Sequence, residues 1–259
     1  MPMRPLARVR ISIHGWTIPC ILFGVISIVF LFPFTASAAP LILNDTNEAP
    51  LTTINHDGFV DIIATEAFRR AGLTYHLVKR PAERALIDSN KGILDGELSR
   101  IEGLEKQYPN LVRVPEVLVT WLFTAFSKQD DIPANLAAIN QHTVGFIKGW
   151  KIFEQMTAGA KTVLTANDPN QLFRMLHLER VEVILYMHAG GNVLIEQQGL
   201  RGIHALTPPL ATRDMFIYLN KRHAKLIARL SNALRNLKAD GFYQRTYDKA
   251  LSRYRSPQP

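Results

Sequence analysis

Residues 94–100, with the sequence LDGELSR, place three charged side chains within six positions: Asp95, Glu97 and Arg100. The planar guanidinium of arginine can bind a carboxylate or phosphate through two parallel hydrogen bonds, which are strong when water is excluded. Arg100 is therefore a candidate for holding an anionic group of a ligand. The alternative is an ion pair with Glu97 or Glu102 on a solvated face. Asp95 is expected to be a structural residue of the turn.

Other basic residues follow predicted strands and are further candidates for binding an anionic group. Arg84 is expected to assist Arg100 in binding an anion, whereas Arg80 is expected at the protein surface. Lys148 and Gly149 stand before a predicted helix, where backbone N–H groups can bind an anion. This short motif is weak evidence when taken alone.

Aromatic residues complete the candidate site. Trp121 and Trp150 could present flat faces to an apolar or cationic group, or they could be core residues without ligand contact. His188 could cap the helix that follows it or face the ligand. No histidines have the spacing of metal ligands, so we expect no metal and no cofactor. The predicted ligand-binding residues are Asp45, Arg84, Ser99, Arg100, Trp121, Lys148, Trp150 and Tyr186.

The elements that must position these residues alternate between strand-like and helix-like segments. Such alternation predicts an α/β protein with mostly parallel sheets, and ligands of open α/β sheets lie beyond the carboxyl ends of the strands. Strands are predicted at residues 40–45, 73–78, 93–98, 116–128, 142–150, 161–166, 181–187 and 214–220. Helices are predicted at residues 57–72, 81–90, 168–179, 188–199, 223–241 and 242–251.

The first 39 residues have the pattern of a secretory signal peptide. Three arginines precede a continuous apolar run from Thr17 to Phe34, and the sequence Ala36-Ser37-Ala38 fits a cleavage site. We therefore expect an exported, periplasmic protein. The alternative is an uncleaved membrane anchor. About 220 residues would remain, enough for one large domain or two small lobes.

The composition of the remaining chain narrows the function further. Cys20, within the apolar run, is the only cysteine, so neither disulfides nor thiolate metal sites are expected. After residue 39 there are 27 Lys and Arg against 22 Asp and Glu, a mild excess spread along the chain. Because no basic run contains interleaved aromatic residues, binding to nucleic acid is not expected.

Four stretches in order resemble the extracellular solute-binding proteins of family 3, the type II periplasmic binding proteins of ABC transporters. The first three stretches are GFVDIIATEAFRRAGL, ALIDSNKGILDGEL and DPNQLFRMLHLERVEVILY. The fourth, LSNALRNLKADGFYQRTYDKAL, is similar to the C-terminal signature of that family. In the third stretch Glu179 replaces the usual glycine and Glu182 the usual aspartate. The resemblance extends over the whole chain after the signal peptide.

The resemblance implies a two-lobe fold in which mixed sheets are flanked by helices and two crossing strands form the hinge. It implies the first part of lobe 1 at residues 40–120, lobe 2 at 121–212 and the return to lobe 1 at 213–259, with crossings near residues 119–126 and 208–217. A small polar solute would bind between the lobes. The expected partner is the membrane permease of an ABC transporter, and the expected state is a monomer without enzymatic activity.

Departures from the family pattern bear on the ligand. The region after the first strand has no aromatic residue, and Tyr186 or Met187 stands where amino-acid binders often have an aspartate for the ammonium group. Arg100 follows Asp95 more closely than the arginine of the family does. An anionic solute is therefore at least as plausible as an ordinary α-amino acid.

Two other functions compete with solute capture for transport. The family's fold has been used for dehydratase chemistry on a prephenate-like acid, and Glu97 with Arg100 could serve such an enzyme, although fold analogy is weak support. A signalling ectodomain would need a membrane helix and an output domain, which no segment after residue 39 resembles. A stand-alone periplasmic sensor that acts through a partner remains an alternative.

Overall fold

The computed structural model describes residues 39–45 and 49–251, and the predicted signal peptide lies outside them. Local signals in the sequence begin and end the helices as expected. In the second helix, α2 (Ala82–Lys91), Pro81 precedes the first turn and Gly92 adopts the left-handed conformation after the last, with φ of 76°. Within the described ranges, no helix is both long and apolar enough to cross a bilayer.

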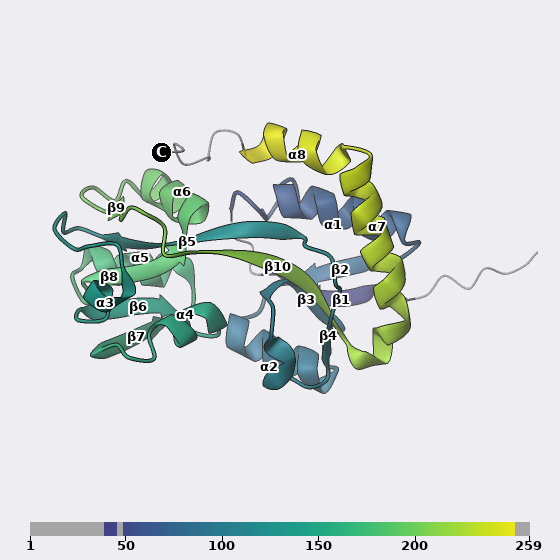
Figure 1. The fold of residues 1–259 in the computed structure, drawn as a ribbon, viewed down its shortest axis with the longest axis horizontal. Coiled ribbons are helices and arrows are strands. Elements are labelled where there is room, and N and C mark those ends of the chain that lie inside the picture. Colours follow the sequence, from purple (N-terminus) through teal and green to yellow (C-terminus); the bar gives the residue numbers. More distant parts are fainter. Residues whose placement is uncertain (1–38, 46–48, 252–259) are drawn as a thin grey trace, which may run out of the picture. The chain divides into compact units, whose positions relative to one another are not determined.

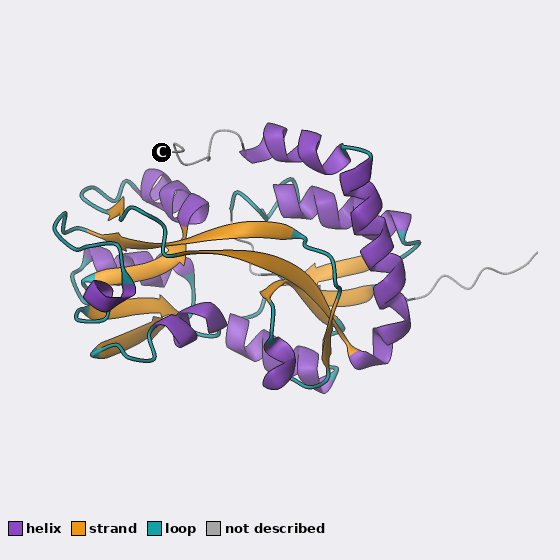
Figure 2. Ribbon diagram, in the orientation of Figure 1, coloured by secondary structure: helices purple, strands orange, loops and turns teal. Residues whose placement is uncertain are grey.

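The strands and helices alternate along the described chain (Figures 1 and 2). The strands are β1 (Leu41–Asn44), β2 (Tyr75–Val78), β3 (Gly96–Ile101), β4 (Leu111–Arg113), β5 (Val119–Ser127), β6 (Thr143–Ile147), β7 (Thr162–Ala166), β8 (Val183–Met187), β9 (His204–Ala205) and β10 (Ala211–Asn220). The other helices are α1 (Phe59–Arg70), α3 (Leu136–Ile139), α4 (Lys151–Met156), α5 (Pro169–His177), α6 (His188–Gln198), α7 (Ile227–Ala239) and α8 (Phe242–Leu251). Two short 3₁₀ helices are η1 (Leu104–Lys106) and η2 (Lys221–Leu226).

Two long strands join two sets of parallel strands. The described strands form one sheet with the order β2-β1-β3-β10-β5-β8-β6-β7, while β4 and β9 pair beside β10 and β5. We call the β1–β3 side lobe 1 and the β6–β8 side lobe 2. Pairing is parallel within each lobe, but β10 is antiparallel to β3 and β5, and β5 is antiparallel to β8. The sheet is therefore mixed, and the expectation of mostly parallel sheets holds only inside each lobe.

Strands β5 and β10 occupy the segments predicted to cross between the lobes. They lie side by side, with Trp121 opposite Arg213, and each continues into pairing with a different lobe (Figure 1). The lobe boundaries predicted after residues 120 and 212 fall inside these two shared strands. These boundaries stay a prediction, because the described part of the chain forms one compact unit.

Apolar faces of the helices cover the sheet. Helix α1 buries Phe59, Ile63 and Ala67, which are spaced for one side of a helix, and α7 buries Leu230, Leu234 and Leu237 against the same core. Figure 1 shows α7 and α8 beside α1. The return segment of the chain is thus packed onto lobe 1, where it completes the core.

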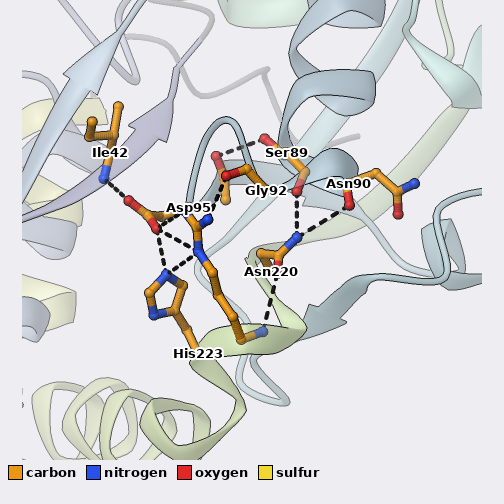
Figure 3. Close-up of polar contacts among 9 residues, drawn as sticks. Ile42, Ser89, Asn90, Gly92, Asp95, Asn220 and His223 are labelled. Atoms are coloured by element: carbon orange, nitrogen blue, oxygen red, sulfur yellow. Dashed lines mark hydrogen bonds and ion pairs between the residues drawn. The ribbon is translucent and has the colours of Figure 1, made fainter.

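A polar cluster around Asp95 fastens the return segment to the start of β3 (Figure 3). The Asp95 carboxylate accepts a hydrogen bond from the backbone N–H of Ile42 at 2.7 Å, and it also contacts the side chains of Arg222 and His223. The Asn220 side chain donates to the carbonyl of Ser89 at 2.8 Å. Asp95 is therefore structural, as predicted from the sequence, and it connects β1, β3 and η2.

The charge of Asp95 makes an acid-sensitive contribution to stability. Burial raises the pKa of this carboxyl, but the Ile42 N–H, Arg222 and His223 outweigh burial and hold the pKa below 3.8. The stabilisation is therefore present above pH 3.8 and is lost as the pH falls through the lower folded-state pKa. We expect Asp95→Asn to lower the free energy of unfolding by about 2 kcal/mol at neutral pH, the usual contribution of hydrogen bonds to a charged group.

Urea unfolding at neutral pH and at about pH 3 tests this expectation. The difference between wild type and Asp95→Asn should shrink in acid, because below pH 3.8 the Asp95 carboxyl of the unfolded wild-type chain binds a proton, which favours unfolding. An equal difference at both pH values would show that the charge of Asp95 does not contribute.

Candidate functional site

A small cavity lies where β3 and α2 of lobe 1 meet β5 and the start of α4. Its volume is about 30 Å³, room for a few atoms of a ligand or roughly two water molecules. Four of the residues predicted from the sequence line it together: Ser99, Arg100, Trp121 and Trp150. The other lining residues are Leu86, Ile101, Leu104, Phe123, Gly149, Lys151, Ile152 and Met215.

A bulge in β3 shapes the polar side of this cavity. Arg100 pairs with Phe216 of β10 and Glu97 pairs with Tyr218, so three steps along β3 match two steps along β10. An extra residue in a strand changes the alternation of faces, which places Glu97 and Arg100 on the same side of the sheet. Both residues and Ser99 lie within β3, whereas the sequence placed Ser99 and Arg100 just after the strand.

Arg100 and Glu97 form a buried ion pair. Arg100 donates from Nε and Nη2 to Oε2 of Glu97, at 2.9 and 2.7 Å, and from Nη2 to the carbonyl of Ala82 at 3.2 Å. Glu97 also accepts from Ser89 Oγ at 2.7 Å and from Asn44 Nδ2 at 3.4 Å. The pairing with Glu97 that the sequence offered as the alternative does exist, but it is buried instead of solvated.

Two polar atoms at the cavity have no hydrogen-bond partner among the described residues: Ser99 Oγ and Trp121 Nε1. Trp121 is 5% exposed, and the indole N–H can only donate. Buried polar groups in folded proteins are usually paired, so such atoms call for a physical explanation. A ligand atom that accepts hydrogen bonds would satisfy both of them.

Aromatic rings form the other side of the cavity. The ring centroids of Trp121 and Trp150 are 5.8 Å apart, and Phe123 lies 5.8 Å from Trp121. Trp150 stacks on Tyr186 at 5.0 Å, with the ring planes 18° apart. Tyr186 therefore packs behind Trp150 and does not line the cavity. Its hydroxyl is buried without a hydrogen-bond partner within the described ranges.

Lys151 connects the two lobes beside the cavity. Its Nζ lies 2.8 Å from Glu83 of α2 and 2.9 Å from Glu154 of α4. Burial lowers the pKa of Lys151, but the two carboxylates outweigh burial and keep the pKa above its ordinary range. Lys151 is therefore charged and already paired. The sequence gave no signal for it, because its partner Glu83 is 68 positions away.

Two glycines let the lobes approach closely. At Gly149 a Cβ atom would lie 2.3 Å from the backbone nitrogen of Glu83, and the glycine has φ of 89°. At Gly190 of α6 a Cβ atom would lie 2.9 Å from the carbonyl oxygen of Ala49. Since no real side chain fits at these distances, the lobes are in direct contact at both positions. The structure is thus a closed arrangement of the two lobes.

The remaining predicted residues lie outside the cavity lining. Arg84 has a side chain that is 68% exposed and paired with Asp88, which also pairs with the half-exposed Arg80. The Lys148 side chain is exposed, and the following helix α4 has only six residues. Asp45 is buried at the end of β1, where its N–H donates to the carbonyl of Val78.

Two other lining residues and His188 complete the comparison with the sequence. Phe123 and Met215 line the cavity from β5 and β10, and the period of two in a strand could have found Phe123 from Trp121. His188 begins α6, and burial lowers the pKa of its imidazole. Its Nδ1 lies 3.4 Å from Thr124 Oγ1, so His188 lies beside the part of β5 that pairs with β8 of lobe 2.

Comparison with known proteins shows a distant but extensive likeness. No family model matches the sequence. An uncharacterized protein of Shewanella oneidensis is 22% identical over 209 residues, which cover 77% of this chain and 78% of that protein. A histidine kinase sensor domain with similarity to periplasmic binding proteins matches 82% of this chain and 96% of its own, with a TM-score of 0.73 and 17% identity. A mutant of ArgBP from T. maritima matches 82% of this chain and 95% of its own, with a TM-score of 0.69 and 17% identity.

These similarities in three dimensions establish the fold. The chain has the type II periplasmic binding protein fold, with two α/β lobes joined by crossing strands. The solved structures named above are a sensor domain and a binding protein, but at 17% identity the likeness does not extend to their ligands. What this chain binds must be argued from its own cavity.

Proposed function

We propose that this protein is a periplasmic solute-binding protein of the family 3 type. It would capture a small polar solute between its lobes and deliver it to the membrane permease of an ABC transporter. The observation that carries the proposal is a pair of donors without a hydrogen-bond partner among the described residues, Ser99 Oγ and Trp121 Nε1, which line one cavity together with Arg100 between the lobes. The cavity side chains that could bind a polar atom are all hydrogen-bond donors, so the solute would present an acceptor such as a carboxylate.

Lobe motion would admit the solute. A cavity of about 30 Å³ is far smaller than the roughly 150 Å³ that holds benzene, so an organic solute cannot enter without separation of the lobes. The contacts at Gly149 and Gly190 would open and then re-form around the ligand, as in hinge closure. Binding without chemistry is favoured because the described residues that line the cavity include no Asp, Glu or His to act as a general base.

The first test is a panel of solutes measured by thermal unfolding of the protein from residue 39 onward. The panel would contain amino acids, mono-, di- and tricarboxylates, phosphorylated solutes and polyamines. A ligand at 100 times its Kd adds about 2.7 kcal/mol of stability. In a domain of this size, each kcal/mol of added stability raises the Tm by roughly 2–4 °C. If no solute raised the Tm, the proposal would fail.

A matched pair of serine variants tests whether the cavity is the binding site. Ser99 and Ser231 both have a buried Oγ without a hydrogen-bond partner in the described chain, but only Ser99 lines the cavity. Ser99→Ala should weaken binding about fivefold, the value of one neutral hydrogen bond, and Ser231→Ala should leave the Kd unchanged. Isothermal titration with the best ligand of the panel measures both values. Equal effects of the two variants would place the site elsewhere.

A sensory role is the second candidate, favoured by the likeness to the histidine kinase sensor domain. Solute capture would be the same, but the closed lobes would contact a signalling partner instead of a permease.

The dehydratase-like alternative predicts conversion of a bound cyclic acid. Chromatography of the ligand after incubation with the protein separates binding from chemistry, since a binding protein returns the ligand unchanged.

A further inference from the structure

The charges around the cavity indicate which solutes fit it. An α-amino acid carries a carboxylate and an ammonium, and each charge needs a partner when it is buried. The polar lining groups Ser99, Arg100, Trp121 and Lys151 can all donate hydrogen bonds. Arg100 and Lys151 already pair with protein carboxylates, so the donors left without a partner among the described residues are Ser99 Oγ and Trp121 Nε1. Among the residues that the structure describes, the lining includes no Asp, Glu, Asn or Gln side chain. The cavity thus offers donors to a carboxylate but no side-chain anion to an ammonium.

The carboxylates of Glu97 and Glu83, which contact the two cations of the lining, are already occupied. Glu97 accepts hydrogen bonds from Arg100, Ser89 and Asn44. Glu83 contacts Lys151 and accepts from the hydroxyl of Tyr108 at 3.2 Å. An ammonium could gain Glu97 only by displacing the buried Arg100 from it, which would leave that guanidinium unpaired at high cost. At Glu83 an ammonium would have to compete with Lys151 and with the hydroxyl of Tyr108.

A third carboxylate, that of Glu154, is also occupied by contacts within the protein. Glu154 contacts Lys151 at 2.9 Å and accepts from the N–H of Gly149 at 3.2 Å. Its position is therefore tied to the backbone at the point where the lobes meet. The side chains that could have bound an ammonium instead neutralise the protein's own lysine and arginine.

The apolar part of the lining completes the description of the ligand. Trp121, Trp150 and Phe123 provide aromatic surface, and Ile101, Leu104 and Met215 are aliphatic. We infer that the solute is a monocarboxylate with an apolar body and no ammonium group. This inference rests on the proposed solute-binding function and specifies its ligand.

Pairs of acids that differ only by the α-ammonium test the inference. One pair is 3-phenylpropanoate and L-phenylalanine, and the other is 4-methylpentanoate and L-leucine. Phenethylamine, which has the ring and the ammonium but no carboxylate, is the opposite control. Isothermal titration should give a Kd at least tenfold lower for each acid than for its amino acid, and no binding of phenethylamine.

The possible outcomes separate this inference from the proposed function. If an amino acid binds as tightly as its matched acid, or more tightly, the inference is wrong and the receptor function stands. The same conclusion follows if neither acid binds but another solute of the broad panel does. If no solute binds in either experiment, the proposed function itself is overturned. A preference for both acids supports the inference.

Discussion

The Arg100→Met variant is expected to lose about 3–5 kcal/mol of unfolding free energy, the usual cost of removing one partner from a buried ion pair. Glu97 is 1% exposed and Arg100 is 7% exposed, so the remaining carboxylate could not be reached by bulk water. Methionine keeps an unbranched apolar stem but is shorter than arginine, so the loss would combine the unpaired charge with some lost packing. Urea unfolding at neutral pH measures it.

The double variant Arg100→Met with Glu97→Gln is the matched control. Removing both charges takes away the unpaired carboxylate, while a glutamine can keep the hydrogen bond from Ser89. We expect the double variant to regain most of the lost stability, since replacing both members of a buried pair is often nearly neutral. If the double variant were as unstable as the single one, the loss would come from packing rather than charge.

Replacing Gly149 by alanine is expected to prevent closure of the lobes. The new Cβ would lie 2.3 Å from the backbone nitrogen and 2.7 Å from the Cα of Glu83, so α2 and the segment before α4 would have to move apart. Alanine at a φ of 89° also costs about 1–2 kcal/mol. We therefore expect stability to fall by that amount and the Kd for the solute to rise roughly thirtyfold, about 2 kcal/mol.

Gly159→Ala is the control for Gly149→Ala. A Cβ at Gly159 would meet nothing within 4 Å, and its backbone is not in the left-handed region, so stability and Kd should stay at wild-type values. Titration of both variants with one ligand gives the comparison. If Gly149→Ala bound the solute as tightly as wild type, closure at this contact would not be part of binding.

Much of the fold could be predicted because its signals are local. Pro81 and Gly92 mark the ends of α2, the apolar spacing of α1 and α7 marks their buried faces, and β5 was recognisable as a long apolar strand. The short elements β4 and α3 were missed. They have three and four residues, too few to establish a period.

The candidate site was predictable only in part, because long-range pairing sets its details. Arg100, Ser99 and Trp150 were predicted from the rule that places ligands near strand ends, and Trp121 was predicted from its place on a crossing strand. The bulge in β3 depends on register with β10, which lies more than a hundred residues away. The pairing of Lys151 with Glu83 likewise exists only once the lobes are together. Arg84 forms an ion pair with Asp88 on its own helix and does not line the cavity.

The most direct test of solute capture uses the two tryptophans of the cavity. Of the three tryptophans in the chain, Trp16 belongs to the predicted signal peptide, so Trp121 and Trp150 provide all the indole fluorescence after residue 39. Titration with 3-phenylpropanoate should give a saturable change in emission that is weaker in affinity for Trp121→Phe, which keeps an aromatic ring and loses the Nε1 donor. An emission unchanged by this acid and by every solute of the broad panel would contradict binding at this cavity.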